Sequence, residues 1–406
     1  MSLRMLRFLT AGESHGPMLV GILEGLPAGI PVDLERVDAE LKRRMAGYGR
    51  GKRMKIESDT ARFVGGIRHG ETLGGPIGWL IENRDWVNWR DVMGSAPADG
   101  GGVAESGNSP APADTRRITR PRPGHADLAG GIKYDRTDLR DVLERASARE
   151  TAGRVAAGAL ARQFVEALGI RVTSHVTRIG PAALPADADP VPFAAALGVD
   201  GSPVRCADDA TADAMIAAID TAHNNLETLG GAFEVIANGL PIGLGSHVQW
   251  DRRLEARLGH ALLSIQAQKG VEIGPAAWSA GQPGSQVQDP ILSDSEGRFR
   301  RPTNNAGGTE GGMTYGGELR LTVYMKPLAT LRQPLPSVDI ESGEAVDAVV
   351  QRSDVCAVPA AAVVGEAMVA LVLADACLEK FGGDSLRETK RNFRGYQAQV
   401  AAYPER

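Results

Sequence analysis

Two histidines lie in segments whose neighbours would leave an imidazole accessible for acid–base chemistry. His15 stands between Ser14 and Gly16, just before an apolar run, and His125 follows Arg122 and two prolines in the loop RPRPGHAD. Histidine is the side chain that most readily gains and loses a proton near neutral pH. Each segment predicts a general acid, although each would equally suit a turn whose histidine only makes hydrogen bonds.

Residues 42–55 (KRRMAGYGRGKRMK) form a strongly basic stretch with seven Lys and Arg side chains and no acidic one. Gly47, Gly49 and Gly51 disfavour a helix and let backbone N–H groups approach a ligand. Arginine holds carboxylates and phosphates through paired hydrogen bonds. We expect a mobile loop that binds a small polyanion. A solvated basic flap or an RNA-contacting patch would have the same composition.

The segment RASARE at 145–150 resembles the start of a helix. Ser147 followed three residues later by Glu150 fits a capping box, so the helix is expected to begin near Ala148. Free N–H groups at a helix N-terminus attract anions, and Arg145 and Arg149 flank this one. A well-capped helix without a ligand explains the same pattern.

Further polar or glycine-rich segments follow in the C-terminal half. They are 266–270 (QAQKG), 304–312 (NNAGGTEGG), Lys326-Pro327 and 352–354 (RSD). Clustered glycines indicate positive φ angles or close approach of a ligand, but any of these segments could be only a turn.

The composition excludes several classes of protein. The 406 residues carry a net charge of −5 and are 43% hydrophobic, as expected of a globular chain that does not bind nucleic acid. Three cysteines cannot form a disulfide framework, and the histidines show no metal-ligand spacing. The apolar run Ala360–Leu378 contains Glu366 and Asp375, so we expect a buried core helix, no membrane span and a cytoplasmic protein.

The elements predicted from periodicity mix strands and helices without strict alternation, which indicates an α+β fold in one domain of residues 1–406. The expected strands are Met18–Leu23, Ile77–Ile81, Ile170–Ile179, Phe233–Ala237 and Leu319–Met325. The expected helices are Glu35–Met45, Ala148–Leu168, Arg252–Ile265 and Pro359–Phe381. Residues 86–120, rich in Gly, Ser and Pro, are expected to form a second exposed, mobile loop, and the tail after Gly383 is polar and charged.

Taken together, these segments resemble the chorismate synthase family. The similar segments keep the family order over nearly the whole chain: GESHGPMLVGILEGLP at 12–27, RRMAGYGRGKRM at 43–54, RPRPGHAD at 120–127, ERASARETAGRVAAGAL at 144–160, QAQKGVEIG at 266–274, TNNAGGTEGG at 303–312 and RSDVCAVPAAAVVGEAM at 352–368.

The resemblance implies an activity and a fold. The activity is conversion of 5-enolpyruvylshikimate 3-phosphate to chorismate and phosphate, a 1,4-anti elimination that needs reduced FMN without net redox change. The fold is an α+β sandwich in which two sheets enclose helices, assembled as a homotetramer. Some family members reduce their own FMN with NADPH.

The resemblance also implies roles for individual residues. His15 would protonate the departing phosphate, His125 the reduced flavin, and Asp354 would act with the flavin N5 in removing the ring proton. Substrate contacts would come from Ser14, Arg44, Arg50, Arg122, Ser147, Arg149 and Arg352. FMN contacts would come from Arg145, Ala146, Ser147, Gln266, Ala267, Gly311, Lys326, Pro327, Leu328, Ala329, Thr330 and Arg352. No metal site is expected.

Two features depart from a compact family member: three or four extra residues at the start, and a longer stretch at Asp99–Thr115. Two other functions remain open. A flavin- or phosphometabolite-binding protein without catalysis is disfavoured by the presence of His15, His125 and Asp354. An RNA-binding protein is disfavoured by the acidic net charge and by an aromatic content of only 5%.

Overall fold

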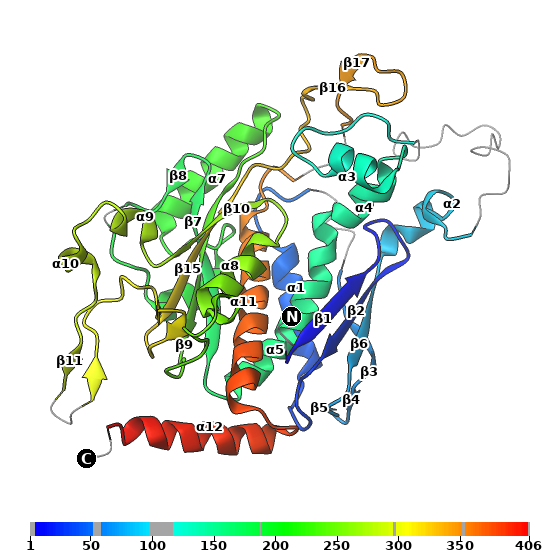
Figure 1. Cartoon of the computed structure of the whole chain (residues 1–406). Coiled ribbons are helices and arrows are strands. Elements are labelled where there is room, and N and C mark those ends of the chain that lie inside the picture. Colours follow the sequence, from blue (N-terminus) through cyan, green and yellow to red (C-terminus); the bar gives the residue numbers. More distant parts are fainter. Residues whose placement is uncertain are drawn as a thin grey trace.

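Two antiparallel sheets face each other across a layer of helices in the computed structural model, which describes residues 5–51, 58–96, 117–186, 188–294, 298–350 and 354–404 (Figure 1). The first sheet has the strand order β1-β2-β6-β3 and the second β10-β15-β9-β7-β8. Their strands are β1 (Arg7–Ala11), β2 (Met18–Glu24), β3 (Arg62–Gly65), β6 (Ile77–Glu82), β7 (Arg171–Ile179), β8 (Ala182–Ala183), β9 (Gly231–Asn238), β10 (Gln268–Ile273) and β15 (Leu319–Met325). The expected α+β sandwich is confirmed.

The helices between the sheets are α1 (Leu34–Met45), α5 (Thr151–Glu166), α8 (Leu254–Leu263) and α11 (Val358–Phe381). Alternate strand residues face them, so Leu19, Trp79 and Leu321 are buried while their neighbours are more exposed. Helices α5 and α11 cross closely where Gly158 meets Ala367. A Cβ atom at Gly158 would lie 2.5 Å from the Ala367 Cα, so a larger residue there would push the two helices apart.

Helix α11 is the core helix that the sequence predicts. Pro359 lies in its first turn, and Gly382, with φ +57°, ends it. By length and composition α11 could cross a membrane, but 94% of its most apolar stretch is buried inside the fold. It therefore forms the centre of a packed globular core.

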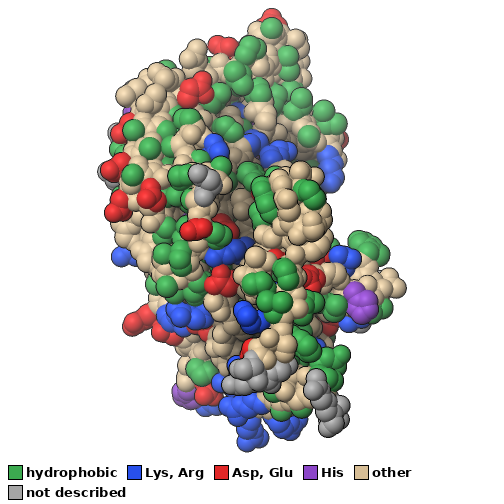
Figure 2. All heavy atoms as spheres, turned by 90° about the vertical axis from the view of Figure 1, so that its left-hand side faces the viewer, with side chains coloured by type: hydrophobic (Ala, Val, Ile, Leu, Met, Phe, Trp, Pro, Cys, Tyr) green, Lys and Arg blue, Asp and Glu red, His purple; other side chains and the backbone are tan. Residues whose placement is uncertain are grey.

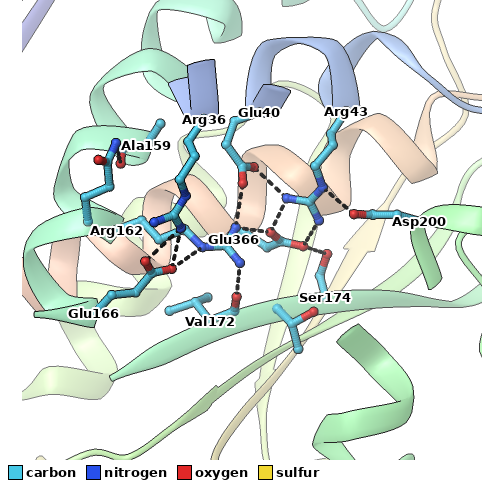
Figure 3. A network of polar contacts seen from close by, with 12 residues as sticks. Arg36, Glu40, Arg43, Ala159, Arg162, Glu166, Val172, Ser174, Asp200 and Glu366 are labelled. Carbon is cyan, nitrogen blue, oxygen red and sulfur yellow. Dashed lines mark hydrogen bonds and ion pairs between the residues drawn. The ribbon is translucent and has the colours of Figure 1, made fainter. Parts of the chain in front are cut away.

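Glu366, on α11, is the centre of a buried ion network (Figure 3). Its carboxylate accepts hydrogen bonds from Arg43 (2.8 and 3.0 Å), Arg162 (2.9 Å), Arg205 (3.0 Å) and the Ser174 hydroxyl (2.6 Å). Burial disfavours the charge, but the three arginines outweigh burial and lower the pKa of Glu366 to about 2. The network joins α11 to α1, α5 and β7.

Shorter elements complete the chain. The helices are η2 (Arg84–Asn88), α2 (Arg90–Met93), α3 (Asp127–Tyr134), α4 (Arg140–Ala146), η4 (Ala148–Glu150), α6 (Phe193–Leu197), η5 (Val199–Gly201), α7 (Asp209–Asn224), η6 (Trp250–Arg252), α9 (Ala276–Ser279), α10 (Gly284–Val287) and α12 (Leu386–Ala401). The two-stranded ribbons are β4–β5 (Ile67–Arg68, Glu71–Thr72), β11–β12 (Leu292–Ser293, Phe299–Arg300), β13–β14 (Thr309–Glu310, Met313–Thr314) and β16–β17 (Pro336–Val338, Ala345–Asp347).

The predicted strands and helices mostly match observed ones, but several elements were missed. The helix expected from Ala148 begins as the 3-10 turn η4 and becomes α-helical at Thr151. Strands β1, β3 and β10 and helices α3, α4, α7 and α12 were not predicted. The polar tail forms α12, because Phe393 packs edge-to-face on Phe381 with ring centroids 5.1 Å apart.

The two expected loops are only partly described. Residues 42–45 belong to α1, residues 46–51 are loop, and residues 52–57 lie outside the described residues. Within the second loop, η2 and α2 are helical and Trp89 between them is buried, while Val87, Asn88, Arg90, Asp91 and residues 94–96 are exposed. Residues 97–116, including most of the longer stretch, lie outside the described part. Mobility of both loops stays a prediction.

Candidate active site

The loop Gly12–Gly16, which carries His15, is fixed from two sides. Asn83 donates to two carbonyl oxygens of the loop, at 2.6 and 3.2 Å. Arg145 donates to a third, at 3.2 Å, and to the carbonyl oxygen of Thr10 at 2.8 Å. The loop is therefore a rigid platform rather than a free turn.

The His15 imidazole contacts a carboxylate and an indole ring. Its Nδ1 lies 2.8 and 2.9 Å from the two carboxylate oxygens of Glu144, and its backbone N–H donates to the same carboxylate at 2.9 Å. The Trp89 ring stacks on the imidazole with centroids 4.0 Å apart. The Glu144 side chain is fully buried, whereas 20% of the His15 side chain is exposed. The histidine is thus both held and accessible, as proton transfer requires.

Arg44 and Arg149 share one buried carboxylate. Arg149 donates to both oxygens of Asp59 at 2.5 and 2.6 Å, and Arg44 approaches one of them at 3.5 Å. Arg44 also donates to the Thr151 hydroxyl at 2.8 Å. Burial, and to a lesser degree the nearby arginines, lower the pKa of Arg44 to about 10. Among the described residues this group therefore has more positive than negative charge.

Arg50 and Asp354 meet beside this group. The Arg50 guanidinium lies 3.2 Å from the Asp354 carboxylate, which also accepts the backbone N–H of Gly51 at 2.6 Å. The electrostatic influence of both residues reaches Arg44. Arg352, two positions before Asp354, lies outside the described residues, so its predicted contacts stay a prediction.

His125 forms a second centre with Asp127 and Arg122. Its Nδ1 lies 2.5 Å from an Asp127 oxygen, and Arg122 donates to the same carboxylate at 2.9 Å and to the Thr330 hydroxyl at 2.8 Å. Burial would raise the pKa of Asp127, but the hydrogen bonds from His125 and Arg122 hold it well below its usual range. Arg122 and His125 therefore share the Asp127 carboxylate.

Most of the predicted flavin-binding residues lie along one chain of contacts between the two histidine centres. Arg145 and Gln266 meet around Thr10 and Glu150, since Thr10 accepts from Arg145 and donates to Glu150. Gln266 donates to the same Glu150 carboxylate at 3.2 Å.

The chain of contacts continues from Ala267 to the His125 loop. The Ala267 carbonyl accepts the Lys326 backbone N–H at 3.0 Å, and the Lys326 ammonium donates to the Gly124 carbonyl at 3.0 Å. Ala146 and Ser147 end α4 beside Arg145, and residues 327–330 lead from Lys326 to the Arg122 contact. Ser147 also caps η4, because its hydroxyl accepts the Arg149 N–H as predicted, whereas Glu150 turns to Thr10 instead of closing the box.

The predicted flavin residues present groups suited to a ligand with N–H donors and a phosphate. Among the described residues, the Gln266 Oε1 atom is buried and has no hydrogen-bond partner. The backbone of Ala267 has φ +65°, a conformation that non-glycine residues seldom adopt. Burial, and then the charge of Lys269, lower the pKa of Lys326. An unmet acceptor beside two neighbouring lysines fits the polar ring edge and phosphate of FMN.

Gly311 is not brought to this group. Its neighbour Gly312 contacts the N-terminal end of α8, where its carbonyl accepts the Leu254 N–H at 2.9 Å. Gln266 follows the opposite end of that helix, whose ten residues span about 15 Å. Gly311 and Gln266 therefore lie near opposite ends of α8.

Other features of the described residues do not compete with this site. A cavity of about 440 Å³ lies at residues 299–304 and 315–318, and its lining contains none of the predicted site residues. No three His, Cys, Asp or Glu side chains are grouped so as to hold a metal ion in the described part of the chain.

Comparison with known proteins decides the family. Residues 6–378 match the model of the family described as chorismate synthase. A chorismate synthase of Symbiobacterium thermophilum is 56% identical over 403 residues, covering 98% of this chain and 100% of that protein. One of Micrococcus luteus is 53% identical, covering 99% and 96%. A crystal structure of chorismate synthase matches with a TM-score of 0.78 at 40% identity, covering 99% of this chain and 100% of that chain.

The chain belongs to the chorismate synthase family. It is a lyase that synthesises chorismate, as the resemblance of its segments predicts, and its α+β fold is that of the family.

Sequence reasoning missed several residues that hold this chorismate synthase site together: Asp59, Asn83, Trp89, Asp127 and Glu144. Asp127 stands two residues after His125 and could have been suspected as its partner. The other four are distant in sequence from the side chains that they contact, and nothing in their local pattern marks them.

Proposed function

We propose that this chorismate synthase binds 5-enolpyruvylshikimate 3-phosphate at the arginine group around Asp59 and eliminates phosphate from it by 1,4-anti elimination. One observation supports this most strongly: Arg44 and Arg149 are buried around a single carboxylate. Burying excess positive charge is costly unless an anion accompanies it. The substrate has a phosphate and two carboxylates, and charge-assisted hydrogen bonds to arginine are about twice as strong as neutral ones.

In this proposal His15 donates a proton to the phosphate oxygen as the C–O bond breaks and its electron pair passes to that oxygen. Ser14, whose N–H donates to the Glu144 carbonyl at 3.0 Å, holds the backbone beside His15. Asp354, paired with Arg50, assists removal of the ring proton. The arginine group and Arg352 stabilise the charge of the departing phosphate.

Reduced FMN is the proposed cofactor, and it supplies the electron chemistry that no side chain can. Arg145, Gln266, Ala267 and residues 326–330 would hold it, with His125 as the proton donor beside it. NADPH is one candidate reductant. Gly311, at the far end of α8 from Gln266, is the remaining proposed flavin contact, and a homotetramer is the proposed assembly.

We infer a cytoplasmic enzyme that acts on small molecules without nucleic-acid or membrane partners. On the face shown in Figure 2, basic and acidic side chains are interspersed rather than gathered into one basic band. A phosphate-backbone binder would need such a band.

An anaerobic assay with 5-enolpyruvylshikimate 3-phosphate, FMN and a chemical reductant tests the proposal. We expect chorismate and phosphate in equal amounts and none without reductant. A repeat with NADPH alone tests whether the enzyme reduces its own flavin. FMN binding without either product would identify a binding protein that lacks catalysis.

A further inference from the structure

Glu144 is the buried partner of His15. Its carboxylate takes both the Nδ1 atom, at 2.8 Å, and the backbone N–H of His15, at 2.9 Å. Arg140, one turn earlier on α4, approaches the same carboxylate only at 3.4 Å. The backbone carbonyl of Glu144 also accepts the N–H of Ser14. One residue of α4 therefore fixes both the position and the ring orientation of the histidine.

Trp89 constrains the same imidazole from a different element. Its ring plane is inclined by 31° to that of His15, with centroids 4.0 Å apart, and its indole N–H donates to Asp85 at 3.0 Å. The Arg140 guanidinium carbon lies 5.2 Å from the centre of the indole ring. Only 8% of Trp89 is exposed, so the stack is shielded from solvent. An indole face attracts a cation, which favours the protonated imidazole.

We propose that Glu144 and Trp89 are positioning residues that hold His15 as a protonated donor, with Nδ1 on the carboxylate and Nε2 directed to the leaving phosphate. This inference rests on the proposed role of His15. A carboxylate on one ring nitrogen fixes which nitrogen can donate and stabilises the imidazolium. When Nε2 gives its proton to the phosphate oxygen, the ring becomes neutral and keeps its Nδ1 proton on Glu144.

A purely structural role is the alternative, since Glu144 also holds the backbone of the loop. Among the described residues, the charged groups near His15 include Glu144, Arg140 and Arg145 on α4, Glu13 on its own loop, and Asp85 beneath Trp89. Because Glu144 is the one in contact with Nδ1, removing its charge should change the protonation-dependent step, whereas a structural role would change substrate affinity or stability.

The test is a double-mutant cycle with Glu144→Gln and His15→Ala, using the full enzyme with FMN and dithionite. We expect Glu144→Gln to lower kcat by about tenfold or more and to leave KM within about twofold. The loss should not exceed that of removing the general acid itself, which is typically about 10²–10⁴-fold. In the His15→Ala background it should cost nothing further.

If Glu144→Gln does not fold, Trp89→Leu combined with His15→Ala provides a second double-mutant cycle. Trp89→Leu should also lower kcat, and it should cause no further loss in the His15→Ala background. Glu234→Gln is the matched control, because Glu234 also contacts a histidine at 2.8 Å (His175) and an arginine at 2.9 Å (Arg320), but on the second sheet. It should leave kcat unchanged.

Three results would overturn the inference: full kcat in both variants, a raised KM with unchanged kcat, or an equal further loss in the His15→Ala background. Full turnover of His15→Ala itself would instead remove the proposed role of His15, so the two failures are distinguishable.

Discussion

Replacing either histidine with alanine is expected to lower turnover by about 10²–10⁴-fold while the protein stays folded, because each imidazole supplies one proton-transfer step. About a fifth of the His15 and His125 side chains is exposed, so neither ring fills the core. The measurement is kcat under anaerobic conditions with FMN and reductant, together with circular dichroism of each variant.

His247→Ala is the matched control, since His247 is exposed and has no place in the proposed site. Normal turnover in both His15→Ala and His125→Ala would remove their assignment as proton donors. If only His125→Ala loses turnover, His15 is not the acid that protonates the departing phosphate.

Glu366→Gln is expected to lower the free energy of unfolding by about 3–5 kcal/mol at pH 7, because it leaves the buried Arg205 and the partly buried Arg43 and Arg162 without their shared carboxylate. The side chain is 1% exposed, so water cannot replace the lost partner. Urea denaturation at fixed protein concentration measures the change. Glu379→Gln is the control on the same helix: its partners Arg252 and Arg257 pair with it near the surface, and we expect a loss of at most about 1 kcal/mol.

The same carboxylate predicts how stability depends on pH. Its folded pKa of about 2 lies below the ordinary value of 4.5, so its stabilisation is complete above about pH 4.5 and is lost as the pH falls toward 2. The unfolding free energy of the native protein should therefore fall more steeply over that interval than that of Glu366→Gln. Parallel curves for the two proteins would contradict the assignment.

The elements that could be predicted from the sequence are those in which neighbouring residues form a recognisable apolar and polar pattern. Strand β15 alternates apolar and polar residues, and α11 is predominantly apolar with proline and glycine at its ends, so each was predictable from a few neighbouring positions. Helix α12 has few apolar residues, and its packing depends on the contact of Phe393 with distant Phe381. A polar segment of this kind is hard to distinguish from a solvated tail.

The candidate site likewise contains some residues that could be predicted from the sequence and others that could not. His15, Arg44 and Arg149 stand in unusual local sequences, and the resemblance assigned their roles. Glu144 and Asp59 reach them from 129 and 15 residues away. Such pairings are set by the tertiary fold, and a single sequence carries no local signal for them.

The Glu366 network also constrains how this protein can change over evolutionary time. Its three arginines come from α1, α5 and the loop between η5 and α7, so replacing any one of the four charged residues removes an ion pair that its partners make inside the fold. Replacing all four charged residues with well-packed apolar ones could be neutral or stabilising. Replacing the four residues one at a time would pass through less stable proteins. We therefore expect related proteins to keep all four charged residues together or to have none of them.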